Sequence, residues 1–223
     1  MSKNIPFESV AARATNKEIF KTIGESARRA SKKLGEERGL PLDGGTQRNS
    51  YVTSIQPTAS TSFICGETTP CVEPISGNAY LQKTLSGSFL VKNKHLMNLL
   101  DSKEQNTDEV WQQVIMEKGS VQNLKCLSDE EKKVFRTAYE MNMREIVEQA
   151  ADRQPYIDQA QSINLFYQTP VSGKYLHDVH MLAWKVGMKS LYYLRSAAPI
   201  NARSLGEETE KRNFDIEECA VCQ

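Results

Sequence analysis

The fold is decided by residues 50–64, which read SYVTSIQPTASTSFI. Residues 50–55 are rich in β-branched and aromatic side chains, so they predict a buried strand. Pro57 has no N–H to donate to a sheet and is expected to close that strand. Small side chains follow, and then the apolar pair Phe63-Ile64, where a helix is expected to start. The stretch therefore predicts a strand, a tight turn and a helix in succession.

The turn in this stretch has the composition of an anion-binding loop. A helix N-terminus presents unpaired N–H groups and a partial positive charge, which suit a phosphate. Small side chains also let an anion approach the backbone. A Ser/Thr-rich turn that merely caps a helix has the same composition, and spacing alone favours this simpler interpretation. The candidate phosphate-binding residues are Pro57, Thr58, Ala59, Ser60, Thr61 and Ser62.

Composition limits the classes of protein that the chain can belong to. Its 223 residues are 39% hydrophobic and 25% charged with zero formal net charge, so bulk charge indicates neither nucleic-acid nor anionic-membrane binding. No apolar run approaches the roughly 20 residues of a membrane span, and no signal-peptide region follows Met1. We expect a cytoplasmic protein. Its odd number of cysteines, five, favours reduced thiols over a disulfide framework.

Outside the opening stretch, the hydrophobic pattern predicts mainly helices. Residues 6–35 form a long helical stretch, in which Ile19, Ile23 and Leu34 belong to a single apolar stripe. A capping box at Ser128 predicts one helix that continues to Ala150. The other predicted elements are helices at 95–100 and 107–119 and short strands at 79–85 and 88–91.

The C-terminal third predicts a parallel βαβ unit. Residues 162–167 are strand-like, 173–186 are helical, and 189–195 form a second strand. His177 and His180 have a spacing that could hold a metal, but the flanking sequence offers no third ligand. We therefore expect two packing or surface histidines and no metal site.

Tyr192 and Tyr193 stand together on the second of these strands. Neighbouring residues of a strand point to opposite faces, so the simplest interpretation is that the two rings fill a core. The functional interpretation is radical transfer, because a tyrosine can lose an electron and its phenolic proton together. Two rings in contact would allow the radical to pass over a short distance from one to the other. The residues alone favour core packing.

The last residues predict a flexible tail that carries two thiols. Residues 202–223 are charged, mostly acidic and without apolar periodicity, and we separate them from residues 1–201. Cys219 and Cys222 can close into a disulfide, or exchange with another one. The alternatives are a chance pair and half of a zinc site, for which the second half is missing.

Three features in this order resemble the large (α) subunit of class I ribonucleotide reductase. They are the loop Pro57-Thr58-Ala59-Ser60-Thr61, the Tyr192-Tyr193 pair and the C-terminal cysteine pair. The resemblance covers essentially the whole chain. Shorter matches are Pro6-Phe7-Glu8-Ser9, Asp158-Gln159-x-Gln161-Ser162 and Trp184-Lys185-x-Gly187-x-Lys189.

The resemblance implies an α/β fold, namely the C-terminal portion of a ten-stranded barrel with mixed helical segments and a flexible tail. It implies the reduction of ribonucleoside diphosphates to deoxyribonucleoside diphosphates for DNA synthesis. Residues 57–62 would bind the substrate phosphates, and Tyr192 and Tyr193 would relay the radical. Cys219 and Cys222 would reduce the active-site disulfide back to thiols.

The resemblance also implies partners and cofactors. The expected partners are the N-terminal part of the large subunit, the radical-generating small (β) subunit, and thioredoxin or glutaredoxin. No cofactor is expected on this chain. The di-iron centre and tyrosyl radical would belong to the small subunit, and ATP or dNTP effectors would bind the N-terminal part.

The family's Asn-Leu-Cys-x-Glu motif, which holds the thiyl cysteine, has no match in this sequence. Cys65 follows Phe-Ile and Cys126 follows Leu-Lys. We therefore expect one piece of a split large subunit, of the kind that some phages encode and that would then act in the host cytoplasm, or a fragment of one. The alternative is a non-catalytic interaction or redox-adaptor protein derived from the same subunit. The Tyr pair and phosphate loop favour the enzyme, since an adaptor has no use for either.

Overall fold

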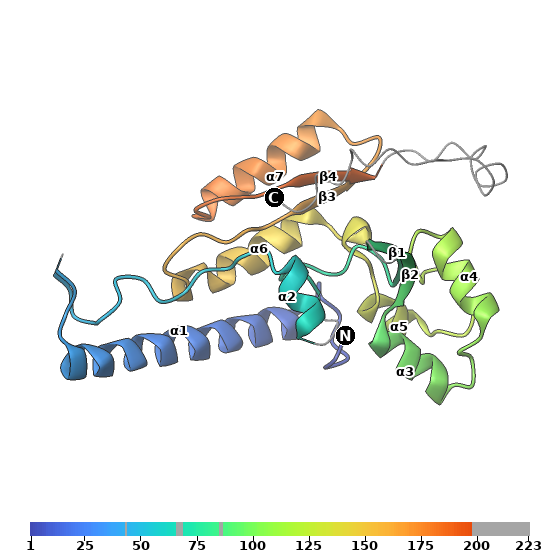
Figure 1. Cartoon of the computed structure of the whole chain (residues 1–223). Coiled ribbons are helices and arrows are strands. Elements are labelled where there is room, and N and C mark those ends of the chain that lie inside the picture. Colours follow the sequence, from blue (N-terminus) through green and yellow to red (C-terminus); the bar gives the residue numbers. More distant parts are fainter. Residues whose placement is uncertain (43, 66–68, 85–86, 198–223) are drawn as a thin grey trace.

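The computed structural model describes residues 1–42, 44–65, 69–84 and 87–197 (Figure 1). None of the helices in this part of the chain is both long and apolar enough to span a membrane. The elements are α1 (Val10–Arg38), α2 (Ala59–Ile64), β1 (Ala79–Thr84), β2 (Gly87–Lys92), α3 (Lys94–Ser102), α4 (Asp108–Met116), α5 (Asp129–Val134), the 3-10 helix η1 (Ala138–Glu140), α6 (Met143–Arg153), the 3-10 helix η2 (Gln154–Tyr156), β3 (Leu165–Gln168), α7 (Gly173–Lys185) and β4 (Leu194–Ala197).

The long helix α1 lies along α6 and extends beyond the rest of the molecule (Figure 1). Its buried positions are Gly24, Ser31 and Gly35. A Cβ atom on Gly24 would stand 2.6 Å from the carbonyl oxygen of Tyr156, so glycine is what allows α1 to approach η2. The face that packs is therefore built from small residues.

The apolar stripe that the sequence predicts on α1 is not its buried face. Ile19 and Ile23 are 43% and 49% exposed. Close packing against η2 requires small side chains, and the larger apolar residues are displaced to the flank of the helix. The prediction of a helix here is confirmed, but the stripe does not mark the contact with α6 and η2.

The parallel βαβ unit is confirmed. Strands β3 and β4 pair in parallel, with Leu165 opposite Leu194 and Gln168 opposite Ala197. Helix α7 joins them and packs directly against α6, with Arg144 Nη2 of α6 3.4 Å from Asp178 Oδ2 of α7. The second strand begins at Leu194, later than predicted. Before it, Tyr192 N–H donates to the Ile163 carbonyl at 2.8 Å, ahead of the regular ladder.

The buried strand expected at 50–55 is reduced to one parallel bridge between Ile55 and Gln161. Tyr51 is 65% exposed, so this segment is not buried along its length. Side-chain hydrogen bonds replace part of the ladder, because Val52 N–H donates to the Asp158 carboxylate at 2.8 Å. The segment still lies beside residues 159–162, with Gln159 N–H donating to the Thr53 carbonyl at 3.1 Å.

The chain expected to form one helix over 128–150 is divided into α5, η1 and α6. The Ser128 capping box is confirmed at the start of α5. A second box at Thr137 starts η1, and the Asn142 side chain caps α6 by accepting from Arg144 N–H at 3.1 Å. Each additional cap starts a separate helix, so the chain does not form the single continuous helix that the apolar spacing predicts.

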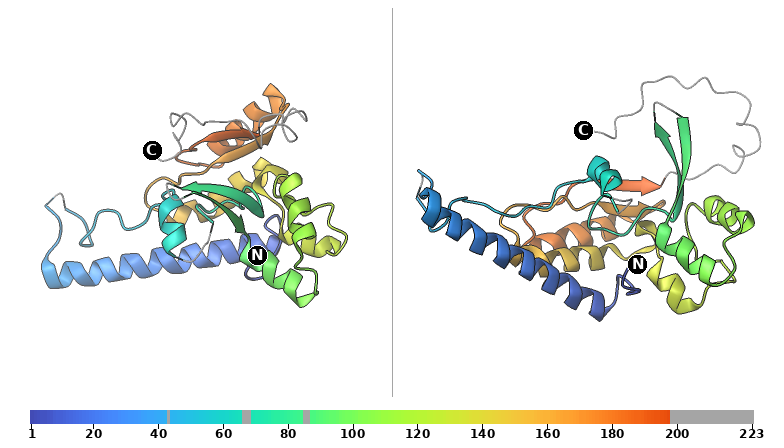
Figure 2. Two further views of the ribbon diagram at one scale, coloured as in Figure 1. Left: turned by 45° about the vertical axis from the view of Figure 1, so that its right-hand side comes forward. Right: turned by 60° about the horizontal axis from the view of Figure 1, so that its bottom comes forward.

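Two hydrophobic cores organise the molecule. One lies in what we call the helical lobe, residues 94–134, and contains the buried side chains of Leu96, Leu100 and Trp111. The other lies in the barrel segment, residues 138–197, and contains Ile146, Leu165 and Val179. The antiparallel hairpin β1–β2, predicted as two short strands, stands out beside the helical lobe (Figure 2).

Candidate active site

The predicted phosphate loop leads directly into helix α2. The helix begins at Ala59, and Ser62 N–H closes its first turn by donating to the Thr58 carbonyl at 2.8 Å. A helix leaves the N–H groups of its first residues without intrahelical partners, which here are those of residues 59–61. The backbone therefore has the form of an anion-binding turn.

Thr58 anchors this loop to the segment around Pro70. Its N–H and its hydroxyl both donate to the Pro70 carbonyl, at 2.8 and 2.9 Å. In this conformation both Thr58 donors are engaged, so a phosphate would be held by the groups that follow. Thr61 is exposed, whereas the Ser62 side chain is buried.

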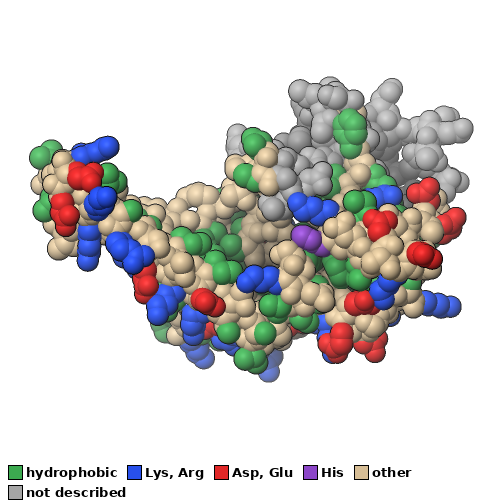
Figure 3. All heavy atoms as spheres, turned by 90° about the horizontal axis from the view of Figure 1, so that it is seen from below, with side chains coloured by type: hydrophobic (Ala, Val, Ile, Leu, Met, Phe, Trp, Pro, Cys, Tyr) green, Lys and Arg blue, Asp and Glu red, His purple; other side chains and the backbone are tan. Residues whose placement is uncertain are grey.

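A cavity of about 820 Å³ opens beside α2. Its wall is mainly apolar and includes Ile5, Ile19 and Phe20 from the N-terminal segment and α1. Seen from below, hydrophobic side chains gather between the α1 arm and the helical lobe, whose outer surfaces are charged (Figure 3). The polar residues in the wall include Ser62, Cys71, Glu73 and Arg153.

Glu73 organises the polar part of this wall. It is buried, and its carboxylate accepts the backbone N–H of Asn164. Cys71 lies beside it and donates from Sγ to the Ser162 carbonyl at 3.2 Å. Burial and the neighbouring Glu73 raise the pKa of Cys71 to about 12, so it stays a neutral thiol at pH 7. Cys71 is therefore a hydrogen-bond donor and not a nucleophile.

Arg153 is a functional candidate that sequence reasoning missed. It is 2% exposed, with Nε donating to Gln161 Oε1 at 2.7 Å and Nη1 donating to Asn16 Oδ1 at 3.3 Å. Burial lowers its pKa to about 10, which leaves the guanidinium charged at neutral pH. It places a fixed cation in the cavity wall. Nothing in its flanking residues distinguishes it from a surface arginine.

Tyr192 and Tyr193 contact each other at the surface. Their ring centroids are 4.1 Å apart, and Tyr192 Oη donates to Tyr193 Oη at 3.3 Å. They are 43% and 46% exposed, which contradicts the core-packing interpretation. The hydrogen bond to Tyr193 raises the pKa of Tyr192, so the phenol keeps its proton at neutral pH. The Arg195 guanidinium lies 5.4 Å from the centre of the Tyr193 ring.

The backbone of the tyrosine pair is fixed to the neighbouring strand. Tyr192 N–H donates to Ile163, and the Tyr193 carbonyl accepts Leu165 N–H at 2.9 Å. Two phenols that contact each other, are accessible from outside and are held by backbone hydrogen bonds just before β4 can exchange a proton and an electron. This arrangement fits the radical-transfer interpretation better than a packing role.

The remaining site predictions concern thiols and metals. Cys219, Cys222 and the tail boundary at 202 lie outside the described residues. Within the described ranges, no group of three or more His, Cys, Asp or Glu side chains is placed to hold a metal ion. The His180 ring nitrogen Nδ1 lies 2.8 Å from the Leu176 carbonyl, so His180 is engaged on its own helix.

Comparison with known proteins gives consistent matches. A family model described as "Ribonucleotide reductase, barrel domain" matches residues 43–194. The ribonucleoside-diphosphate reductase large subunit of Invertebrate iridescent virus 6 is 46% identical over 200 residues, covering 87% of this chain and 21% of the relative. That of Invertebrate iridescent virus 3 is 41% identical over 228 residues, covering 100% of this chain and 36% of the relative.

A solved structure agrees with these matches. The "Actinobacillus ureae class Id ribonucleotide reductase alpha subunit" is 40% identical with a TM-score of 0.81, covering 88% of this chain and 36% of that chain. The chain thus spans little more than a third of the length of these proteins, or less. Its mixed helices and parallel strands are those of an incomplete α/β barrel. The chain belongs to the ribonucleotide reductase barrel-domain family.

Proposed function

We propose that this chain is a working part of a ribonucleoside-diphosphate reductase. In that reaction the 2′-hydroxyl of the substrate is replaced by hydrogen and leaves as water, and two thiols supply the electrons by forming a disulfide. The observation that carries the proposal is the exposed contact between Tyr192 and Tyr193, with 3.3 Å between the phenolic oxygens. A structural or adaptor protein has no need for two adjacent phenols accessible at its surface.

The substrate phosphates bind at the start of α2. The N–H groups of residues 59–61, which have no acceptor within α2, and the hydroxyls of Ser60 and Thr61 supply the donors. Support comes from the geometry of the turn and from Thr58, which holds the loop against Pro70. The cationic Arg153 in the wall of the adjacent cavity favours an anionic substrate there.

The rest of the large subunit and a radical-generating small subunit complete the enzyme. The cavity beside α2 and the exposed Ile19 and Ile23 on α1 form an apolar surface that a second polypeptide segment would cover. The small subunit delivers the oxidising equivalent to Tyr192 and Tyr193. Cys219 and Cys222 return the active-site disulfide to thiols, and thioredoxin or glutaredoxin reduces them in turn.

The test is single-turnover reduction in the enzyme assembled with the rest of the large subunit and the small subunit. Tyr192→Phe and Tyr193→Phe should each abolish the first turnover, because phenylalanine keeps the ring but has no phenolic proton and is much harder to oxidise. Tyr51→Phe is the matched control, since Tyr51 is also exposed but lies outside the pair. A first turnover close to wild type in both pair variants would overturn the relay.

The tail requires a separate experiment, because it acts after the chemistry. Replacing Cys219 and Cys222 together by serine should allow the first turnover and then stall with thioredoxin as the reductant. A small dithiol, which can enter the site directly, should restore steady turnover. Loss of the first turnover in this double variant would contradict the assigned order of events.

A further inference from the structure

One segment of the chain separates the two proposed functional regions. Residues 159–165 run between the segment that leads into the phosphate loop and the segment that carries the tyrosine pair. On one side, Ser162 N–H donates to the Ile55 carbonyl at 3.0 Å. On the other, Ser190 Oγ donates to the Gln161 carbonyl at 3.2 Å, and Tyr192 N–H donates to Ile163. Both regions are thus hydrogen-bonded to the same backbone segment.

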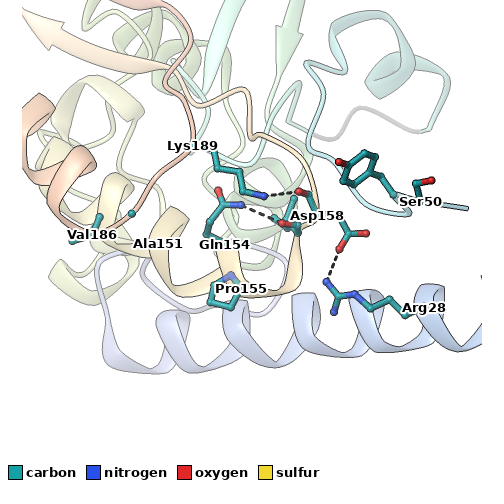
Figure 4. A pocket seen from close by; sticks show the side chains of 11 residues that line it. Arg28, Ser50, Ala151, Gln154, Pro155, Asp158, Val186 and Lys189 are labelled. Carbon is teal, nitrogen blue, oxygen red and sulfur yellow. Dashed lines mark hydrogen bonds and ion pairs between the residues drawn. The ribbon is translucent and has the colours of Figure 1, made fainter. Parts of the chain in front are cut away.

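Asp158 immediately precedes this shared segment and bonds to both sides of it; Figure 4 shows its bonds to Lys189 and Arg28. On the loop side, its carboxylate accepts Val52 N–H at 2.8 Å and its own N–H donates to Thr53 Oγ1 at 2.9 Å. On the tyrosine side, its carbonyl accepts Lys189 Nζ at 2.5 Å. Its second carboxylate oxygen accepts from Arg28 Nη2 of α1 at 2.7 Å. Asp158 is therefore hydrogen-bonded to three other parts of the chain.

We infer that Asp158 is a positioning residue that holds the phosphate loop and the tyrosine pair in a common register. The inference rests on the proposed function and deepens it. Val52 precedes Pro57 by only a short extended segment, and Lys189 precedes Tyr192 by three positions. In an extended chain a slip of one residue turns each side chain to the opposite face. Fixing the register at Asp158 therefore fixes which way the loop donors and the phenols point.

The electrostatics suit this role. The Asp158 side chain is 14% exposed, so water does not easily replace its partners. Burial alone would raise the pKa of its carboxyl, but the hydrogen bonds from Arg28 and from Val52 N–H outweigh burial and hold this pKa below its usual value. The carboxylate is consequently charged throughout the physiological range. Bonds to a charged acceptor are stronger than neutral ones.

The experiment compares three variants in the assembled enzyme. Asp158→Asn removes the charge that holds Arg28 and weakens the bond to Val52, so it releases the loop side and the start of the shared segment. Lys189→Met removes only the bond on the tyrosine side. Asp152→Asn is the matched control, because Asp152 also pairs with an arginine of α1 at 2.7 Å, is 18% exposed, and touches neither region.

Two readouts separate positioning from plain stability. The KM for the ribonucleoside diphosphate reports the loop, and the rate of the first turnover reports the tyrosine pair. A fluorotyrosine at Tyr193 adds a ¹⁹F signal that reports the ring environment without any catalysis. Lys189→Met should slow the first turnover about tenfold, leave KM within about twofold, and shift the ¹⁹F signal. A tenfold change corresponds to about 1.4 kcal/mol.

Asp158→Asn should raise KM about tenfold and slow the first turnover about tenfold together, while Asp152→Asn should change neither by more than about twofold. Equal effects of Asp158→Asn and Asp152→Asn would reduce Asp158 to a stabilising residue and overturn the inference. So would an unmoved ¹⁹F signal in both Asp158→Asn and Lys189→Met. If instead the proposed relay fails, the Tyr→Phe variants stay active while the ¹⁹F signal still shifts, so the two failures are distinguishable.

Discussion

The helical lobe and the barrel segment both have buried centres, and they differ in how many large apolar side chains stand exposed at their margins. In the lobe, Leu96, Leu100 and Val114 are completely buried. The barrel segment and the α1 face beside it also have a buried centre, but their margins are open, with Ile23, Tyr192 and Leu194 each more than 40% exposed. The proposed functional residues lie on the open side. In the lobe the exposed large apolar side chains are Ile115 and Met116 at the end of α4, so its margin is more closed than that of the barrel segment.

The comparison is tested most strongly by truncating one large side chain in each region. Trp111 is 2% exposed, and its Nε1–H donates to Asn106 Oδ1 at 2.6 Å. Trp111→Ala should lower the free energy of unfolding by about 3–5 kcal/mol through the cavity and the lost bond. Ile23→Ala on the open face should cost less than about 1 kcal/mol, because little of that side chain is buried within this chain.

Denaturant unfolding followed by circular dichroism measures both variants. The assembled enzyme then sharpens the result, because Ile23→Ala should weaken association with the rest of the large subunit, and Trp111→Ala should affect it only through stability. An equal loss of stability from the two substitutions would contradict the division into a closed and an open region.

Glycines at the ends of helices give a second comparison between the regions. Gly119, in the lobe, has a φ of +86°, and a Cβ there would lie 2.4 Å from Gly77 Cα. Gly119→Ala must therefore move backbone and should cost about 3 kcal/mol. Gly187, after α7, has a φ of +77° but no atom within 4 Å of the added Cβ. Gly187→Ala should cost about 1 kcal/mol, from backbone strain alone.

Thermal unfolding of the two glycine variants checks this prediction. A shift in the melting temperature for Gly187→Ala as large as that for Gly119→Ala would show that the region after α7 is as tightly packed as the lobe.

The parts that sequence predicts well are those fixed by local chemistry. The cap at Ser128 and the βαβ order from β3 to β4 follow from neighbouring residues, and the structure contains them. The phosphate-loop turn is similarly local, since Pro57 ends one segment and α2 begins at Ala59. Its proposed ligand remains a prediction.

The parts that sequence does not predict depend on distant contacts. The buried face of α1 is set by how closely Gly24 approaches Tyr156, which no spacing rule contains. Arg153 is buried because Asn16 and Gln161 meet it from other elements. Tyr192 and Tyr193 are also exposed because no other element of the described structure covers them. The residue pattern alone wrongly favoured a buried position for the two rings.

The smallest expected effects come from the N-caps, and they separate stability from function. Ser128 accepts from Glu131 N–H at 3.4 Å in the lobe, and Ser172 accepts from Tyr175 N–H at 3.1 Å at the start of α7. Ser128→Ala and Ser172→Ala should each lower the free energy of unfolding by about 1 kcal/mol, because each leaves an N–H at a helix start without its acceptor. Only α7 leads directly into Lys189 and the tyrosine pair. Ser172→Ala should therefore also slow the first turnover in the assembled enzyme by a few fold, whereas Ser128→Ala should leave that rate unchanged. Denaturant unfolding and single-turnover rates measured on the same preparations test both statements, and a slower first turnover in Ser128→Ala would show that the two regions are coupled more tightly than their separate cores indicate.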